Sequence, residues 1–175
     1  SEVEEVTKEI KRLVEEIHKR SREALEETRR LVETIHRDSK RVLDEIERLL
    51  EEVRKLAEDG VDKRDIKRLA KEILKRLEDM MRRVTELWKE IIERDRRLLE
   101  ESKKRWDEVI EELRRKVRDE KRVRDLLEKL REDAKRDEDA SRKSEEDIRK
   151  VVEEDKREAE KLLKRIEDEL RKTEK

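Results

Sequence analysis

The sequence contains no cysteine, no proline, no phenylalanine and no tyrosine, and its single glycine is Gly60. The absence of cysteine excludes disulfide bonds and thiolate metal sites. Because two tryptophans are the only aromatic residues, the core must be mainly aliphatic. No apolar run approaches the roughly 20 residues that a helix needs to cross a bilayer, so we predict no membrane segment.

A net charge of one sign is also lacking, because 53 Lys and Arg residues are matched by 54 Asp and Glu residues. Disorder usually combines low hydrophobicity with a charge imbalance, whereas a balanced chain has no global self-repulsion to keep it expanded. The two signs are interleaved, so no basic block predicts a nucleic-acid or membrane partner. The acidic start, SEVEEVTKEI, has no signal-peptide pattern and leaves the cellular location undetermined. A composition of 61% charged and 31% apolar residues is typical of long helices, here expected to be soluble.

What the chain does contain is an internal repeat. LVEEIHKRSREAL at 13–25 returns as LVETIHRDSKRVL at 31–43, and the two histidines, His18 and His36, take the same place in each copy. The offset from Leu13 to Leu31 corresponds to five turns at about 3.6 residues per turn, the value of a straight helix, so we expect little supercoiling. The histidines are then about 27 Å apart along a helix, too far to share one metal ion.

Apolar residues recur every three or four positions along most of the chain, which predicts long amphipathic helices. The first helix is expected at about 2–58 and the second at about 63–117, joined by a turn at 59–62 where Gly60 closes one helix and Asp62 caps the next. Between 118 and 122 the apolar pattern loses phase, which predicts a second turn and a third helix at about 123–174. The alternative is one continuous helix over 63–175 that pairs with a second chain.

These elements predict an all-α fold, a single-chain antiparallel up-down-up bundle of three long, nearly straight helices that forms one domain over 1–175. The wide apolar stripe indicates that each helix packs against partners. We expect a monomer that requires no partner, with helix-mediated self-association as the alternative, in which an apolar stripe stays open for another helix.

Polar residues interrupt the apolar stripe with the same period. Trp88 and Trp106 are separated by the same offset as the two histidines, and so are Asp137 and Asp155. In an up-down-up bundle, the positions of each His–Trp pair and each His–Asp pair fall at one level. Two layers are therefore predicted, one of His18, Trp106, Asp137, Ser21 and Ser102, the other of His36, Trp88, Asp155, Ser39 and Thr85. A middle layer of Thr28, Asp95 and Ser144 is a further candidate.

The chemistry of such a layer is self-consistent. An ionised aspartate only accepts hydrogen bonds, whereas indole N–H, imidazole N–H and serine O–H groups all donate them. A fully paired layer need not add much stability, but it penalises any register that leaves its members unpaired. The layers are therefore predicted to be structural and to specify helix register.

Sharper alternatives to this structural interpretation have weaker support. His18, Ser21 and Asp137 have the residue types of a nucleophilic triad, but a mid-helix position offers no oxyanion hole. One histidine and one aspartate per layer form a weak metal site, because three or four converging ligands are needed. A pH-responsive pair of histidines is the more plausible alternative, since burial lowers and a neighbouring aspartate raises the pKa of an imidazole. We predict no enzyme, no catalytic, cofactor-binding or metal-binding residues, and no cofactor.

The regular helices, the Glu/Lys/Arg surface, the missing Pro, Phe and Tyr, and the periodic His/Trp/Asp/Ser layers resemble those of de novo designed helical bundles. More narrowly, the chain is similar to parametrically built, untwisted three-helix bundles with buried hydrogen-bond networks. The resemblance covers the whole chain and rests on style rather than on a diagnostic motif. It implies high stability and no natural biochemical function. Natural spectrin-type three-helix repeats are a second resemblance, but their helices are shorter and their aromatic residues are less regular.

Overall fold

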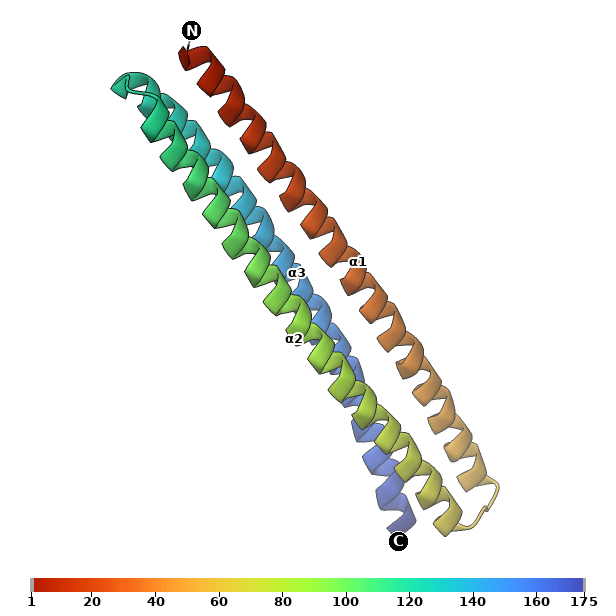
Figure 1. Cartoon of the computed structure of the whole chain (residues 1–175). Helices are drawn as coiled ribbons and strands as arrows, with labels where there is room; N and C mark the ends of the chain where they lie inside the picture. The colour runs from red at the N-terminus through yellow and green to blue at the C-terminus, as the bar shows by residue number, and fades with distance from the viewer. Residues whose placement is uncertain (1, 175) are drawn as a thin grey trace. The chain divides into compact units, whose positions relative to one another are not determined.

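The computed structural model describes residues 2–174, which form three α-helices. These are α1 (Glu2–Glu58), α2 (Lys63–Lys116) and α3 (Glu120–Glu174), and no strand is present in the described residues (Figure 1). The chain runs along α1, returns along α2 and runs along α3 in the direction of α1. The predicted all-α fold with three antiparallel, up-down-up helices is confirmed.

The contacts within the chain group into two compact units. Among the described residues, unit 1 comprises 2–31 and 91–147, and unit 2 comprises 32–90 and 148–174. Each unit takes one segment from each of the three helices. One domain over 1–175 stays a prediction, and its two end residues lie outside the described range.

The connection between α1 and α2 belongs to unit 2 and follows a Schellman pattern. Gly60 has a φ of +79°, a conformation that residues with a side chain rarely adopt. Its N–H donates to the Ala57 carbonyl at 3.3 Å, and the N–H of Val61 donates to the Leu56 carbonyl at 3.1 Å. Asp62 then caps α2, because its Oδ1 accepts from the backbone N–H of Arg64 at 3.0 Å.

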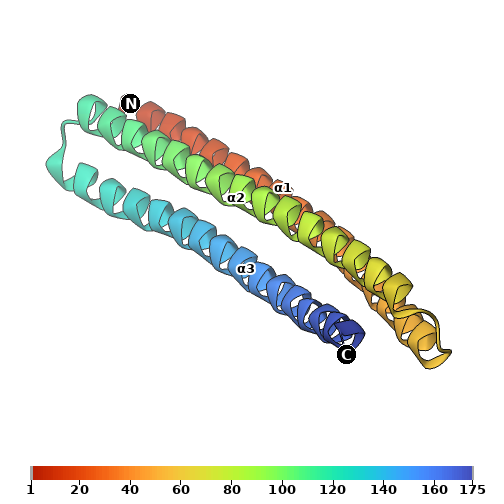
Figure 2. The same cartoon turned by 90° about the horizontal axis from the view of Figure 1, so that it is seen from below.

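Figure 2 shows the connection between α2 and α3, which belongs to unit 1. It is shorter than the predicted turn at 118–122. Only residues 117–119 lie outside the helices, and α3 begins at Glu120. Asp119 is the reason, because its Oδ1 accepts from the N–H of Lys121 at 3.1 Å and of Arg122 at 3.5 Å. The polar run that suggested a turn is the exposed first turn of a helix with an aspartate cap.

Each unit has its own aliphatic core. In unit 1 the buried cluster comprises Ile10, Val14, Ile17, Trp106, Val109, Leu113, Val117, Leu127 and Leu130. In unit 2 it comprises Leu43, Ile46, Leu50, Val53, Ile66, Ile73, Leu77, Ala159, Leu162 and Ile166. All three helices contribute to both clusters. Burial of each large aliphatic side chain contributes about 1.5–3 kcal/mol, which makes these clusters the main source of stability.

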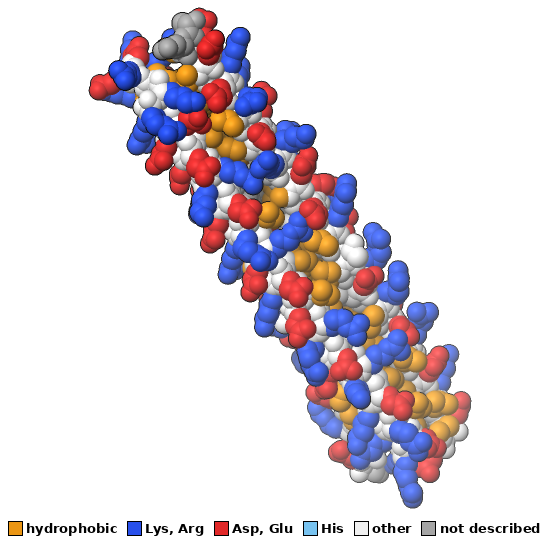
Figure 3. All heavy atoms as spheres, in the orientation of Figure 1, with side chains coloured by type: hydrophobic (Ala, Val, Ile, Leu, Met, Phe, Trp, Pro, Cys, Tyr) orange, Lys and Arg blue, Asp and Glu red, His pale blue; other side chains and the backbone are white. Residues whose placement is uncertain are grey.

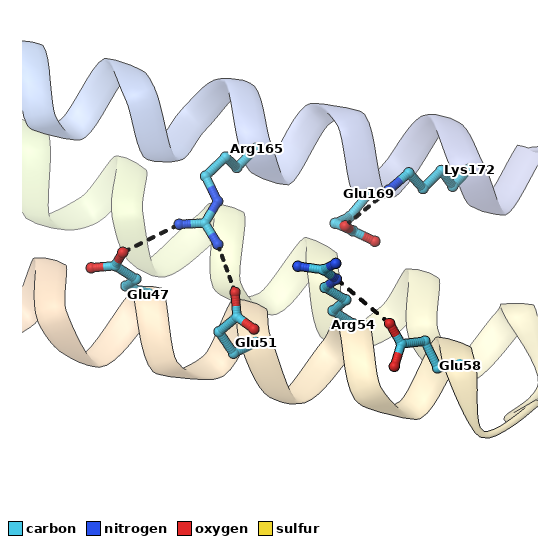
Figure 4. Close-up of polar contacts among 7 residues, drawn as sticks. All are labelled: Glu47, Glu51, Arg54, Glu58, Arg165, Glu169 and Lys172. Atoms are coloured by element: carbon cyan, nitrogen blue, oxygen red, sulfur yellow. Dashed lines mark hydrogen bonds and ion pairs between the residues drawn. The ribbon is translucent and has the colours of Figure 1, made fainter.

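The surface is mostly charged. On the face drawn in Figure 3, a narrow stripe of apolar side chains runs between rows of Lys/Arg and Asp/Glu side chains. In unit 2, Arg165 of α3 donates to Glu47 of α1 at 3.4 Å and to Glu51 at 3.3 Å (Figure 4). Such exposed ion pairs contribute about 0–1 kcal/mol each to folding stability, much less than the aliphatic clusters.

Candidate functional site

The first polar layer, defined as His18, Trp106 and Asp137, brings together one side chain from each helix of unit 1. His18 Nδ1 lies 2.9 Å from Asp137 Oδ1, and Trp106 Nε1–H donates to Asp137 Oδ2 at 3.2 Å. The imidazole and indole rings meet edge to face, with centroids 5.4 Å apart and an interplanar angle of 66°. Each oxygen of the Asp137 carboxylate thus has its own partner from a different helix.

The three side chains of the first layer differ in how deeply they are buried. Trp106 is one of the residues of the unit 1 core, with 3% of its surface exposed, so its indole is fixed by aliphatic neighbours. The His18 side chain is 28% exposed and that of Asp137 14%, which places the pair at the edge of the core. The carboxylate therefore keeps some contact with solvent while it joins α1, α2 and α3 through hydrogen bonds.

The second polar layer, defined as His36, Trp88 and Asp155, repeats only half of this arrangement in unit 2. His36 Nδ1 lies 2.7 Å from Asp155 Oδ1. Trp88 is 4% exposed and Asp155 is 8% exposed. Neither Trp88 Nε1 nor Asp155 Oδ2 has a hydrogen-bond partner among the described residues. The hydrogen bond between α1 and α3 is therefore present in both layers, and the hydrogen bond from α2 only in the first.

The electrostatics of Asp155 reflect this incomplete pairing. Burial raises the pKa of the Asp155 carboxyl above its usual range. The charge of His36 and its hydrogen bond oppose that rise, and the neighbouring Glu154 adds to it. The net direction is upward, so desolvation outweighs the single imidazole partner.

The hydroxyl residues predicted for the two layers make no hydrogen bond with them in the described part of the chain. Ser21 and Ser102 are half-buried beside the first layer. Ser39 is 2% exposed and its Oγ has no partner among residues 2–174. The level predicted for them is therefore not matched by a hydrogen bond to His, Trp or Asp.

Thr85 departs from the prediction more clearly. It is exposed, and its hydroxyl donates to the Met81 carbonyl of its own helix at 2.7 Å. The physical reason is angular. The position one repeat before Ser102 is Val84, so Thr85 is rotated by one residue, about 100°, away from the core-facing line. Residue numbers fix the level along a helix and not the direction of the side chain.

The predicted middle layer lies within unit 1. Thr28 is 1% exposed, Asp95 is 5% exposed and Ser144 is half-buried. Thr28 Oγ1 has no partner among the described residues, and no hydrogen bond of that part of the chain joins the three side chains. The three residues are thus core-facing without forming a connected network.

Asp95 has the most perturbed electrostatics of the described acidic groups. Burial and the charge of Glu145 raise the pKa of Asp95 to about 6, and Arg94 lowers it in part. Arg94 is held 2.7 Å from Glu27, so its charge is already shared with another carboxylate. Sequence reasoning missed this setting, because Arg94, Glu27 and Glu145 resemble ordinary surface charges.

The described residues also bear on the alternative sites considered from the sequence. No hydrogen bond joins Ser21 to His18 there, so the nucleophilic arrangement of hydroxyl and imidazole is not formed. Within 2–174, no group of three or more His, Asp or Glu side chains is placed to hold a metal ion. In the same range, no helix is long and apolar enough to cross a membrane.

Comparison with known proteins agrees with the fold. No family model matches the sequence, and no curated protein is significantly similar to it. A solved structure described as a computationally designed three-helix bundle is similar in structure, with a TM-score of 0.51 and 21% sequence identity. The match covers 98% of this chain and 90% of that one. The resemblance to designed three-helix bundles is confirmed at the level of the fold.

Proposed function

We propose that the protein is a designed structural scaffold without a natural biochemical activity, in which the polar layers specify how the helices are registered. The observation that carries this proposal is the first layer, where Asp137 of α3 accepts from Trp106 of α2 and shares a second hydrogen bond with His18 of α1. A shift of one helix by a turn, about 5.4 Å, would separate these partners and leave buried polar groups unpaired. The aliphatic core has no comparable directional requirement.

The matching fold of a designed bundle and the absence of a family match support the same proposal. High stability, little supercoiling and the lack of a catalytic role belong to it as well. The near-continuous helical pattern and the two aliphatic clusters favour high stability. A straight helix path is favoured by the sequence repeat, whose period matches a whole number of straight helical turns.

A register test separates specificity from stability. The variant His18→Leu/Trp106→Phe/Asp137→Leu replaces the first layer by apolar groups, which is expected to keep or raise the free energy of unfolding. Because the chain has no cysteine, spin labels can be attached at Lys19→Cys and Asp139→Cys, two exposed positions on α1 and α3 of unit 1. The parent is expected to give one narrow distance distribution, and the apolar variant a broad or double one.

The matched control is Arg20→Ala, which removes an exposed ion pair with Glu16 near the same level without touching the layer. It is expected to leave the distance distribution unchanged. A narrow, unshifted distribution in the apolar variant would show that the aliphatic core alone determines the register, and the proposal would be abandoned.

A pH-responsive module is the second candidate, and Asp95 favours it. The carboxyl has a raised pKa of about 6 in the folded protein, against about 3.9 in an unfolded chain. The folded state thus prefers the neutral acid, and the stability cost of ionisation grows as pH rises from about 4 to about 6. Acidification through this range strengthens the fold at Asp95. The free energy of unfolding is therefore expected to rise when Asp95 is protonated. Unfolding curves of the parent and of Asp95→Asn at several pH values test this.

A further inference from the structure

The second layer contains two buried polar atoms with opposite requirements. Trp88 Nε1–H is a donor and Asp155 Oδ2 is an acceptor, and neither finds a partner among the described residues. Both side chains are more than nine-tenths buried. Native proteins rarely leave such groups unpaired, because each one has lost its hydrogen bonds to solvent.

The first layer indicates where these two atoms lie relative to each other. His18–Asp137 and His36–Asp155 have the same sequence separation of 119 residues and similar distances of 2.9 and 2.7 Å. The carboxylate of α3 therefore takes an equivalent place against α1 in both layers. The tryptophans occupy equivalent positions of the sequence repeat, and in the first layer the indole reaches the carboxylate at 3.2 Å. In the second layer the corresponding pair forms no hydrogen bond.

We propose that unit 2 binds one internal water molecule between Trp88 Nε1 and Asp155 Oδ2. The water accepts the indole N–H and donates to the carboxylate, which joins α2 to α3 where the direct contact is missing. The chemistry selects this ligand. A cation cannot accept from the indole, and an anion is repelled by the carboxylate, so the ligand must both accept and donate.

Two further observations agree with a water at this place. Ser39 Oγ of α1 is a third buried polar atom of the predicted second layer without a partner in 2–174, and internal waters commonly make about three hydrogen bonds. Burial also raises the pKa of Asp155 despite the contact with His36, and a hydrogen bond donated by a water would offset part of that desolvation. A bound water supplies that donor without moving a helix.

The experiment measures magnetisation transfer between water and the two indole N–H protons by NMR on the intact, ¹⁵N-labelled protein. The Trp88→Phe and Trp106→Phe variants assign the two signals. Trp88 Hε1 is expected to show a dipolar contact with a long-lived water, whereas Trp106 Hε1, which donates directly to Asp137, is expected to show none. Trp106 thus serves as the matched control within the same molecule.

The Ser39→Ala variant excludes relay through a serine hydroxyl. The water contact of Trp88 Hε1 is expected to persist in it, because the two groups that define the site, Trp88 Nε1–H and Asp155 Oδ2, are unchanged; its disappearance would overturn the proposal. A high-resolution crystal structure gives the second readout, a water peak within hydrogen-bonding distance of Trp88 Nε1 and Asp155 Oδ2. A direct Trp88–Asp155 hydrogen bond there, or equal water contacts for both indoles, would also overturn it.

Discussion

The two polar layers have the same residue types at the same spacing and differ in one contact. In unit 1, both oxygens of Asp137 are occupied, one by His18 and one by Trp106. In unit 2, His36 pairs with one oxygen of Asp155, and Trp88 makes no hydrogen bond to the other. The contact between α1 and α3 is thus reproduced by the sequence repeat, and the contact of α2 is not.

The two tryptophans also differ in their surroundings. Trp106 is a residue of the unit 1 core and packs its ring against His18, with centroids 5.4 Å apart. Trp88 is as buried, at 4% exposure, but it is not one of the buried residues that form the unit 2 cluster. An indole can donate a hydrogen bond only when its ring is correctly oriented, and packing against neighbouring side chains helps to fix that orientation. The same residue types at the same spacing therefore do not guarantee the same hydrogen bonds.

The largest expected effect comes from removing the two carboxylates in turn. Asp137→Ala leaves the buried Trp106 N–H without its acceptor and should lower the free energy of unfolding by about 3 kcal/mol. Asp155→Ala removes one contact to a partly exposed imidazole and also relieves the desolvation of the carboxylate, so about 1 kcal/mol is expected. Urea unfolding at pH 7 measures both. Equal losses, or a larger loss for Asp155→Ala, would contradict the difference between the layers.

The second prediction adds a third buried carboxylate to the comparison. Asp95 has no hydrogen bond among the described residues and a raised pKa of about 6, so at pH 7 it is ionised at a cost. Asp95→Asn removes the charge and should raise the free energy of unfolding at pH 7 by about 2 kcal/mol. The gain should shrink as pH falls towards 4, because the parent carboxyl becomes neutral.

Unfolding curves of parent and variant at pH 7, 5.5 and 4 check this sign. Asp107→Asn, an exposed position on the same helix, is the matched control and should change little. A gain of stability that stays constant with pH would show that ionisation of Asp95 is not the cause.

The third prediction exchanges each tryptophan for phenylalanine. Trp106→Phe removes the donor to Asp137 Oδ2 as well as part of the ring, and about 2 kcal/mol of destabilisation is expected. Trp88→Phe loses ring volume but no direct hydrogen bond to protein, so about 1 kcal/mol is expected. Thermal or urea unfolding of the two variants shows which one is destabilised more. A larger cost at Trp88 would mean that its N–H has a stronger partner than the first layer provides.

Sequence patterns predict what depends on spacing along a helix. The cap at Asp62 is recognisable because Gly60 precedes it, whereas Asp119 has no glycine before it, so the predicted start of α3 at 123 falls after the observed start at Glu120. The level of each His–Asp pair follows from helix rise and chain direction, both of which the sequence reveals. The aim of the Trp88 indole does not, because it depends on how neighbouring side chains pack in three dimensions. The pKa of Asp95 likewise depends on its burial in the bundle and on the charge of Glu145, which α3 contributes.

The smallest expected effect is at Thr85, which the sequence pattern places in the second layer. Its hydroxyl donates to the Met81 carbonyl and its side chain is exposed, and it makes no hydrogen bond to His36 or Asp155. Thr85→Ala should change the free energy of unfolding by no more than about 0.5 kcal/mol, because higher helix propensity offsets the lost local hydrogen bond. A loss above about 1 kcal/mol in urea unfolding would place Thr85 inside the second layer after all. A negligible change would agree with the placement of Thr85 outside the second layer.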